Sequence, residues 1–540
     1  MASVLPTVSV AEVTVVRPKP ATNAGPGSPV NGDRVEHPDT IDVVPVTKPQ
    51  DPATFRGKYI IWPGLFLFVA LTAGAIYLIT ANSINQRNAM LDRVNGFDTR
   101  FKINGTSGGG TTVVLPEAPG GSRNPQVYPK RGCAQANYVS KNGQLYAEAN
   151  GKSVPFSIKG INWSGMETGF AIPFGLWANP QNGTTLFEIA SFLAENRFNA
   201  VRLPLAINYI VNNQPPIVAI VNTYENAALN VTNYLSAITS IVQAFEFRNI
   251  SVLLDLHTIS GYENGGLPWQ NAADQAKYLH AVDILTSTFC KAGFWNILGI
   301  DVKNEPYLGT WGDNSPNDFR LQAQIIANQM LKGCPNWLAF IEGISTGQQL
   351  TMDNENFYFY DWWGGGLEGA ANAPVQLNVP HKVVYAPHYY NPAVYPQKYF
   401  LKGGYNNGEL VVNYQELDDA GLKNRIHMTA EHMFGHLRHS QDGAVVLGEF
   451  GGLYTQDAHP MKTTQRATKF LMQEMMQPGY AGGFLWSLNP ESGYQYNPSD
   501  TRVNAQEGIL QLSWTAVNEP FLHALTALDA LPNLKTMPCL

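Results

Sequence analysis

Residues 250–257 read ISVLLDLH and residues 296–304 read NILGIDVKN, two short and almost wholly apolar runs that end on polar side chains. Runs of this kind are typical of parallel strands whose two faces are both buried. Six further runs of the same type follow a spacing of about 40–60 residues: VPFSIKGI (154–161), FNAVRLP (198–204), LAFIEG (338–343), KVVYAPH (382–388), AVVLGEF (444–450) and GGFLWSL (482–488).

The intervals between these runs have room for a helix and its loops, and FEIASFLAENR at 187–197 has the amphipathic pattern of one such helix. Eight strand and helix units predict an α/β fold, a (β/α)8 TIM barrel, within a folded region at residues 133–540. An open, doubly wound sheet is also compatible with this periodicity.

Three segments of different character precede the folded region. Residues 1–57 are rich in Pro, Val and Thr without apolar period and predict a disordered cytosolic tail. Residues 58–80 predict a transmembrane helix, because 22 residues from Tyr59 to Thr80 carry no charge and about 20 suffice to span a bilayer. Residues 81–132 have the Gly, Ser and Pro content of a flexible stalk.

Cysteines and glycosylation sequons favour an extracellular or lumenal place for the folded region, because all of them follow the predicted span. Lys and Arg counts on its two sides are equal and do not orient it. We therefore predict a single-pass membrane protein. The cysteines are Cys133, Cys290, Cys334 and Cys539, and the Asn-x-Ser/Thr sequons begin at Asn104, Asn162, Asn182, Asn230 and Asn249.

Composition restricts the class of ligand. The chain of 540 residues has a net charge of -7, so it offers no global positive field for nucleic acid. Charged residues make up 14%, against about 25% in ordinary proteins. The polar surface must then consist largely of amides, hydroxyls and Tyr, which suits neutral, hydroxyl-rich ligands.

Polar side chains gather where several apolar runs end, and barrel enzymes place catalytic groups at the C-terminal ends of their strands. Hydrolysis of a glycosidic bond needs two facing carboxyl groups, one to protonate the leaving oxygen and one to attack the anomeric carbon. Glu305 and Glu449 are the predicted pair. The residues at these run ends are Arg202, His257, Asn304, Glu305, His388, Tyr390, Glu449 and Trp486.

The ordered set of motifs resembles glycoside hydrolase family 5, a family of retaining barrel glycosidases, and most closely its endo-β-1,4-glucanase (cellulase) branch. The resemblance extends over most of residues 152–530. It rests on GINWSGMET (160–168), NAVRLPL (199–205), Asn304-Glu305-Pro306, WWGGGLEGA (362–370), NVPHKVVYAPHYYNPAVYP (378–396), Gly448-Glu449-Phe450-Gly451 and GGFLWSLNPESG (482–493).

The resemblance implies that Glu305 is the general acid/base and Glu449 the nucleophile of a double displacement. Arg202 and Tyr390 would hold the nucleophile, and His388 would stand near the acid. No cofactor or metal is expected, because these groups supply the acid, base and nucleophile.

The remaining site residues would bind sugar. By the same resemblance, Asn304 would bond the sugar 2-hydroxyl, His257 would line the subsite at the cleaved bond, and Trp486 would form a stacking floor. Further stacking platforms are expected at Trp163, Trp362 and Trp363. One departure from the cellulase branch is Lys303, where a His is expected.

The implied activity is endo-hydrolysis of β-1,4-glucan. Mannan, xyloglucan or β-1,3-glucan are alternative substrates, and transglycosylation or a non-catalytic wall-binding role are alternative functions. The sequence leaves the oligomeric state undetermined.

Three other motifs compete with this hypothesis. Gly343 to Gly347 matches the Gly-x-Ser-x-Gly nucleophile elbow, but that interpretation leaves both Glu motifs unexplained. A His cluster lacks the Glu that directly follows the first His in zincins. Gly364 to Gly366 has no following Lys-Ser/Thr, so we expect a flexible loop. The cluster consists of His427, His432, His436 and His439, with Glu431.

Four cysteines allow three disulfide connectivities. On the inferred barrel, Cys290 and Cys334 precede the fourth and fifth strands and would lie on neighbouring units. Cys133 and Cys539 bracket the domain. The favoured pairs are therefore Cys290 with Cys334 and Cys133 with Cys539.

Overall fold

The computed structural model describes residues 70, 72, 74, 124–179, 181–261 and 263–540. The predicted tail and residues 81–123 of the predicted stalk lie outside these residues. Of the predicted span, only Ala70, Thr72 and Gly74 are described, and they are helical and exposed. Within the described part of the chain, no helix has the length and apolar character needed to cross a bilayer. The chain divides into two units, 1–85 and 86–540, and the folded elements below belong to the second.

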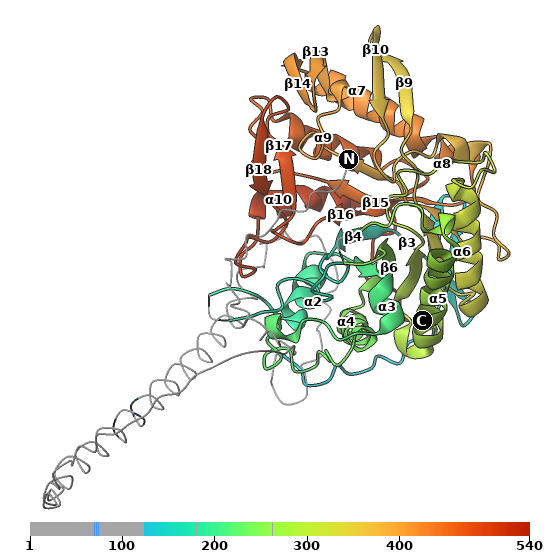
Figure 1. The fold of residues 1–540 in the computed structure, drawn as a ribbon, viewed down its shortest axis with the longest axis vertical. Coiled ribbons are helices and arrows are strands. Elements are labelled where there is room, and N and C mark those ends of the chain that lie inside the picture. Colours follow the sequence, from blue (N-terminus) through green and yellow to red (C-terminus); the bar gives the residue numbers. More distant parts are fainter. Residues whose placement is uncertain (1–69, 71, 73, 75–123, 180, 262) are drawn as a thin grey trace, which may run out of the picture. The chain divides into compact units, whose positions relative to one another are not determined.

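Eight parallel strand positions form a closed barrel (Figure 1). Strand β11 pairs with both β8 and β15, which closes the ring, and β12 continues the sixth position. The predicted barrel is confirmed, and this closure excludes the open sheet. Its strands are β4 (Ile158–Asn162), β5 (Ala200–Ala206), β6 (Ser251–Thr258), β7 (Ile297–Asp301), β8 (Leu338–Ile341), β11 (Val383–Tyr385), β12 (His388–Tyr390), β15 (Val445–Gly451) and β16 (Tyr480–Trp486).

The connections between strands carry most of the helices. These are α2 (Leu186–Glu195), α3 (Ile207–Asn212), α4 (Tyr234–Phe247), α5 (Ala272–Phe289), α6 (Phe319–Gly333), α7 (Asp419–Ala430), α8 (Leu437–Ser440), α9 (Thr463–Glu474) and α10 (Glu519–Ala524). Helix α2 corresponds to the amphipathic run expected at 187–197. Its start is fixed by a capping box, in which the Thr185 hydroxyl accepts from the Glu188 backbone N–H and the Glu188 carboxylate accepts from the Thr185 N–H.

The fifth unit departs from the predicted strand and helix repeat. Between β8 and β11 the chain forms an antiparallel hairpin of β9 (Gly347–Met352) and β10 (Glu355–Tyr360), then a short 3-10 helix, η4 (Glu368–Ala371), but no α-helix. The turn residues Asp353 and Asn354 both have positive φ, which favours a hairpin. Alternating buried Phe and exposed Tyr in β10 gives a period of two rather than the helical period.

A small antiparallel sheet covers the N-terminal end of the barrel. It comprises β1 (Asn137–Lys141), β2 (Gln144–Ala149) and β3 (Lys152–Phe156). The predicted run from Val154 is therefore split, because β3 belongs to this sheet and the barrel strand begins at Ile158. Tyr138, Leu145 and Phe156 belong to one buried cluster with the apolar side chains at the N-terminal end of the barrel interior.

Both favoured disulfides are confirmed. Cys290 pairs with Cys334 and Cys133 pairs with Cys539, with Cα–Cα distances of 5.7 and 5.0 Å. The first bond joins the segments that precede β7 and β8. The second joins the two ends of the folded region across 406 residues of sequence.

Candidate active site

The inner face of the barrel changes from apolar to charged along each strand. Side chains two residues apart on a strand point to the same side. On β6, the inward side chains are therefore Leu253, which lies in the apolar interior, then Asp255 and then His257. The same step leads from Phe340 to Glu342. The apolar members fill the N-terminal half, and the polar ones meet at the C-terminal end.

Glu449 lies on β15, and each of its carboxylate oxygens accepts one hydrogen bond. The guanidinium of Arg202 on β5 donates to Oε1 at 2.6 Å, and the Tyr390 hydroxyl donates to Oε2. The Glu449 side chain is only 4% exposed. These two donors fix the direction of the carboxylate and compensate its charge.

Glu305 follows β7 and adopts φ 48°, a left-handed backbone conformation that residues other than glycine rarely adopt. Its backbone N–H donates to Oε2 of Glu342 at 2.8 Å, which holds this conformation in place. The Lys303 ammonium donates to the preceding carbonyl of Asn304 at 2.6 Å and to the Asn264 side chain at 3.0 Å. Held backbone strain of this type is common where a catalytic side chain must be aimed.

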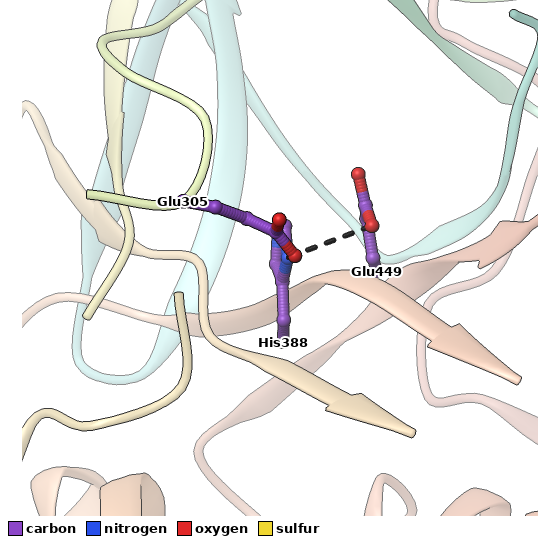
Figure 2. A group of neighbouring side chains, drawn as sticks. All are labelled: Glu305, His388 and Glu449. Atoms are coloured by element: carbon purple, nitrogen blue, oxygen red, sulfur yellow. Dashed lines mark hydrogen bonds and ion pairs between the residues drawn. The ribbon is translucent and has the colours of Figure 1, made fainter. Parts of the chain in front are cut away.

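Glu305 and Glu449 face each other across His388 (Figure 2). One carboxylate oxygen of each glutamate and a ring nitrogen of His388 all lie within 4.8 Å of one another. His388 Nδ1 lies 3.3 Å from Glu305 and 3.5 Å from Glu449. Carboxyl groups this close suit a retaining mechanism, in which the two lie about 5–5.5 Å apart, whereas inversion needs about 6.5–9.5 Å to admit water.

Arg202 is the centre of a larger buried network that the sequence did not reveal. Besides Glu449, its guanidinium contacts Asp255 at 3.1 Å, Asp301 at 3.0 Å and Glu342 at 3.0 Å. All three of these carboxyl groups have fully buried side chains. The signal available in sequence was an acidic residue at an inward position of an apolar run, in LLDL, GID and LAFIE.

Burial and mutual repulsion determine the protonation of this network. Burial raises the pKa of Asp255 to about 6, although Arg202 opposes the shift. Burial also raises the pKa of Glu342 well above its ordinary value. The pKa of His388 is raised well above its ordinary value despite burial, because Glu342 and Glu449 stabilise the imidazolium. His388 therefore stays charged beside Glu449, and its Nε2 lies 3.1 Å from the Glu342 carboxyl group.

His257, Asn304 and Trp486 line the same end of the barrel. His257 Nδ1 lies 2.6 Å from the Asp255 carboxylate, and burial lowers its pKa to about 3. Asn304 accepts from Arg202 at 3.0 Å, and its amide nitrogen lies 3.4 Å from His257 Nε2. Trp486 is half-buried and its ring lies nearly parallel to that of His257, with an interplanar angle of 14°.

The prediction of a stacking platform is wrong for two of the tryptophans. Trp163 is fully buried, donates its indole N–H to the Phe174 carbonyl and packs on Phe245. Trp362 is 5% exposed and packs among aromatic rings. Both are core residues, so neither offers a ring face to a sugar. Trp363 is half-buried and stacks on Tyr307 with 4.0 Å between the ring centroids, and its role as a platform stays a prediction.

Gly364 has a packing role rather than the flexibility expected of its loop. Its φ is +77°, and a Cβ there would meet Glu342 Oε2 at 2.5 Å and His388 Cγ at 3.0 Å. Only glycine lets this loop approach the buried Glu342 and His388 so closely.

The other competing motifs do not assemble into sites. Ser345, the centre of the elbow-like pentapeptide, donates its hydroxyl to the Asp361 carbonyl. The clustered histidines have separate partners: His427 faces Glu474, His432 faces Gln348, and His436 faces the Glu431 carbonyl.

Metal-ligand groups converge at two places among the described residues, Glu305–His388–Glu449 and Asp255–Asp301–Glu342. The guanidinium of Arg202 lies among the second set and already supplies its positive charge. His388 is itself a member of the first set, and its charged imidazole supplies the positive charge there. Both sets therefore have the chemistry of ion-pair networks.

Glu167, in the loop after β4, is a buried carboxyl that gives a test of the electrostatics. Its carboxylate accepts from the Gly165 N–H at 2.7 Å, but burial raises its pKa to about 8. An unfolded carboxyl titrates near 4.5, so the folded state binds this proton more tightly, and its contribution to stability is lost as pH rises from about 4.5 to 8.

We therefore expect Glu167→Gln to match the wild-type free energy of unfolding near pH 4 and to exceed it by a few kcal/mol near pH 8. Denaturant unfolding at a series of pH values measures the difference. A pH-independent difference between the two proteins would contradict the assignment.

Comparisons with known proteins agree with this geometry. The family model for cellulase, glycosyl hydrolase family 5, matches residues 147–492. The major extracellular endoglucanase of Xanthomonas campestris pv. campestris is 30% identical over 395 residues, 73% of this chain and 71% of that protein. An endoglucanase of Paenibacillus polymyxa is 27% identical over 386 residues, 71% of this chain and 85% of that protein. Among solved structures, the Pyrococcus horikoshii endocellulase complex with cellotetraose has a TM-score of 0.58 at 27% identity, covering 73% of this chain and 99% of that one.

Proposed function

This chain belongs to glycosyl hydrolase family 5, and from that premise we propose that it is an endo-acting glycosidase that hydrolyses β-1,4-glucosidic bonds in cellulose-like glucans with retention. The observation that carries the proposal is the pair of glutamates at the C-terminal end of the barrel, with carboxylate oxygens within 4.8 Å.

In the first step, Glu449 attacks the anomeric carbon and Glu305 protonates the leaving oxygen. Glu449 is held by Arg202 and Tyr390 in one orientation, so little reorganisation precedes attack. The product of this step is a covalent glycosyl-enzyme and a released glucan end.

In the second step, Glu305 takes a proton from water, which attacks the same carbon and frees Glu449. The Glu305 side chain is 19% exposed, whereas that of Glu449 is 4% exposed, so the acid/base has the better access to water. The positive charge on His388 lies between both glutamates and compensates the negative charge that moves from one to the other.

Sugar binding is supported by the groups around this pair. The half-buried Trp486 can stack on a pyranose face, and Asn304 lies beside the carboxylates in position to bond a sugar hydroxyl. No cofactor or metal enters these steps.

The test is viscosity loss of carboxymethylcellulose, measured against new reducing ends. An endo-acting enzyme lowers viscosity steeply for few ends released, and NMR of the first product would show the β-anomer. Viscosity unchanged on this polymer, with hydrolysis of mannan, xyloglucan or β-1,3-glucan, would reassign the substrate. Binding without turnover on every polymer would contradict the proposal.

We also propose that the barrel works outside the cytoplasm, tethered by the span at 58–80. Two disulfides in the folded region support an oxidising compartment. Asn230 is exposed and its sequon is accessible, whereas Asn162 is fully buried against Arg202 and its sequon is not. Protease protection of the full chain in membrane vesicles would test this topology.

A further inference from the structure

The hairpin that replaces the fifth barrel helix has two different faces. Phe357 and Phe359 of β10 are buried on one face, while Tyr358 and Tyr360 are 72% and 70% exposed on the other. Alternate residues of a strand point the same way, so the two tyrosines form a line with about 7 Å between them. Large exposed rings in such a row are unusual unless they bind something.

The rest of the exposed face is neutral and rich in hydrogen-bonding groups. Tyr358 pairs in register with Gln349, and Asn356 pairs with Thr351. Tyr360 is opposite Gly347, and a Cβ on that glycine would lie 3.7 Å from the tyrosine ring. The ring therefore lies over the glycine, against the sheet, and presents its other side to solvent.

The buried face holds the hairpin rigidly. Arg425 of α7 lies over the Phe357 ring at 4.8 Å and pairs with Asp353 at 2.8 Å and Glu355 at 3.3 Å. Figure 1 shows α7 beside β9 and β10. The Gln397 amide donates to the Tyr360 carbonyl at 2.8 Å. A platform that is already ordered loses little entropy when it binds a ligand.

We propose that this hairpin face, made of Gly347, Gln349, Thr351, Asn356, Tyr358 and Tyr360, is an auxiliary binding site for a β-glucan chain outside the catalytic cleft. Pyranose rings present C–H faces that stack on aromatic rings, and their equatorial hydroxyls bond amides and hydroxyls. The face carries no charge, which suits a neutral polymer and gives no attraction for an anionic one. The hairpin leaves the barrel at the C-terminal end of β8, the end at which the catalytic glutamates lie.

The inference rests on the proposed function for the identity of the glycan, and the test separates the two. The full chain is compared with a Tyr358→Ala/Tyr360→Ala double variant and with Tyr224→Ala, since Tyr224 is also 72% exposed but lies elsewhere in the chain. Binding is measured by depletion from a microcrystalline cellulose suspension in the cold. Catalysis is measured as kcat/KM on cellotetraose, which is too short to occupy a distant site together with the cleft.

We expect the double variant to bind cellulose about tenfold more weakly, which corresponds to two lost stacking contacts. Its kcat/KM on cellotetraose should stay within about twofold of the parent, and Tyr224→Ala should match the parent in both assays. Equal cellulose binding by the double variant and the parent would overturn the inference. A change from dimer to monomer in the double variant, seen by sedimentation, would also overturn it, because the face would then join two copies of the chain. If cellotetraose is cleaved by none of the proteins while the binding loss persists, the proposed function fails and the inference stands.

Discussion

Replacing Glu449 by Gln should lower kcat on carboxymethylcellulose by about 10⁴-fold or more, because the nucleophile forms the covalent intermediate on which both steps depend. Gln is nearly isosteric and still accepts a hydrogen bond from Arg202, so the fold should be retained. Viscosity loss at matched concentrations measures the effect, and circular dichroism checks the fold.

Glu305→Gln serves as the matched control, because it removes the proton donor instead of the nucleophile. Its first step should persist on an aryl cellobioside with an acidic phenol as leaving group, which needs no protonation. Glu449→Gln should be inactive on that substrate as well. Equal activity of the two variants on the activated substrate would contradict the assignment of the two roles.

Arg202→Met should lower the free energy of unfolding by about 5 kcal/mol or more and abolish activity. Four carboxyl groups contact this guanidinium, on β6, on β7, directly after β8 and on β15, and all of them lose this contact in the variant. Breaking one buried pair already costs about 3–5 kcal/mol. Urea unfolding at pH 7 measures the loss.

The pH dependence of this variant has a defined sign. Burial already raises the pKa of Asp301, as it does that of Glu342, and Arg202 opposes both shifts. Without Arg202, both folded pKa values should rise further above the unfolded value. A raised carboxyl pKa makes stability fall as pH increases, so the variant should be more stable at pH 5 than at pH 8. Arg202→Met with Asp301→Asn should regain part of the loss at pH 8. A pH-independent loss, unchanged by the second substitution, would show that packing rather than charge is responsible.

The barrel was predictable because its signal is local. Each strand is a run of apolar residues that needs burial on both faces, and this is visible in LLDL or AVVLG without knowledge of any partner. The same holds for Glu305 and Glu449, since each directly follows or ends such a run. The disulfide between Cys290 and Cys334 was predictable once the order of the strands was inferred, because the two cysteines precede neighbouring strands.

The missed features depend on what meets across the barrel. Asp255, Asp301 and Glu342 are ordinary acidic residues in sequence, and their importance arises because the closed ring places all three on one guanidinium. Trp163 was expected to be a platform, but whether a Trp stacks on a ligand or fills the core depends on the side chains that cover it. The hairpin after β8 was likewise outside the regular repeat.

By itself, then, the amino-acid sequence determined the class of fold, the glutamate pair that meets at the end of the barrel and the favoured disulfide pairs, because hydrophobic period and short motifs are written along the chain. Only the tertiary structure decided which aromatic rings face solvent, which buried carboxyls share Arg202, and how near Glu305 lies to Glu449. Those properties depend on distances between residues remote in sequence, and such distances are set by the closure of the barrel and the packing around it.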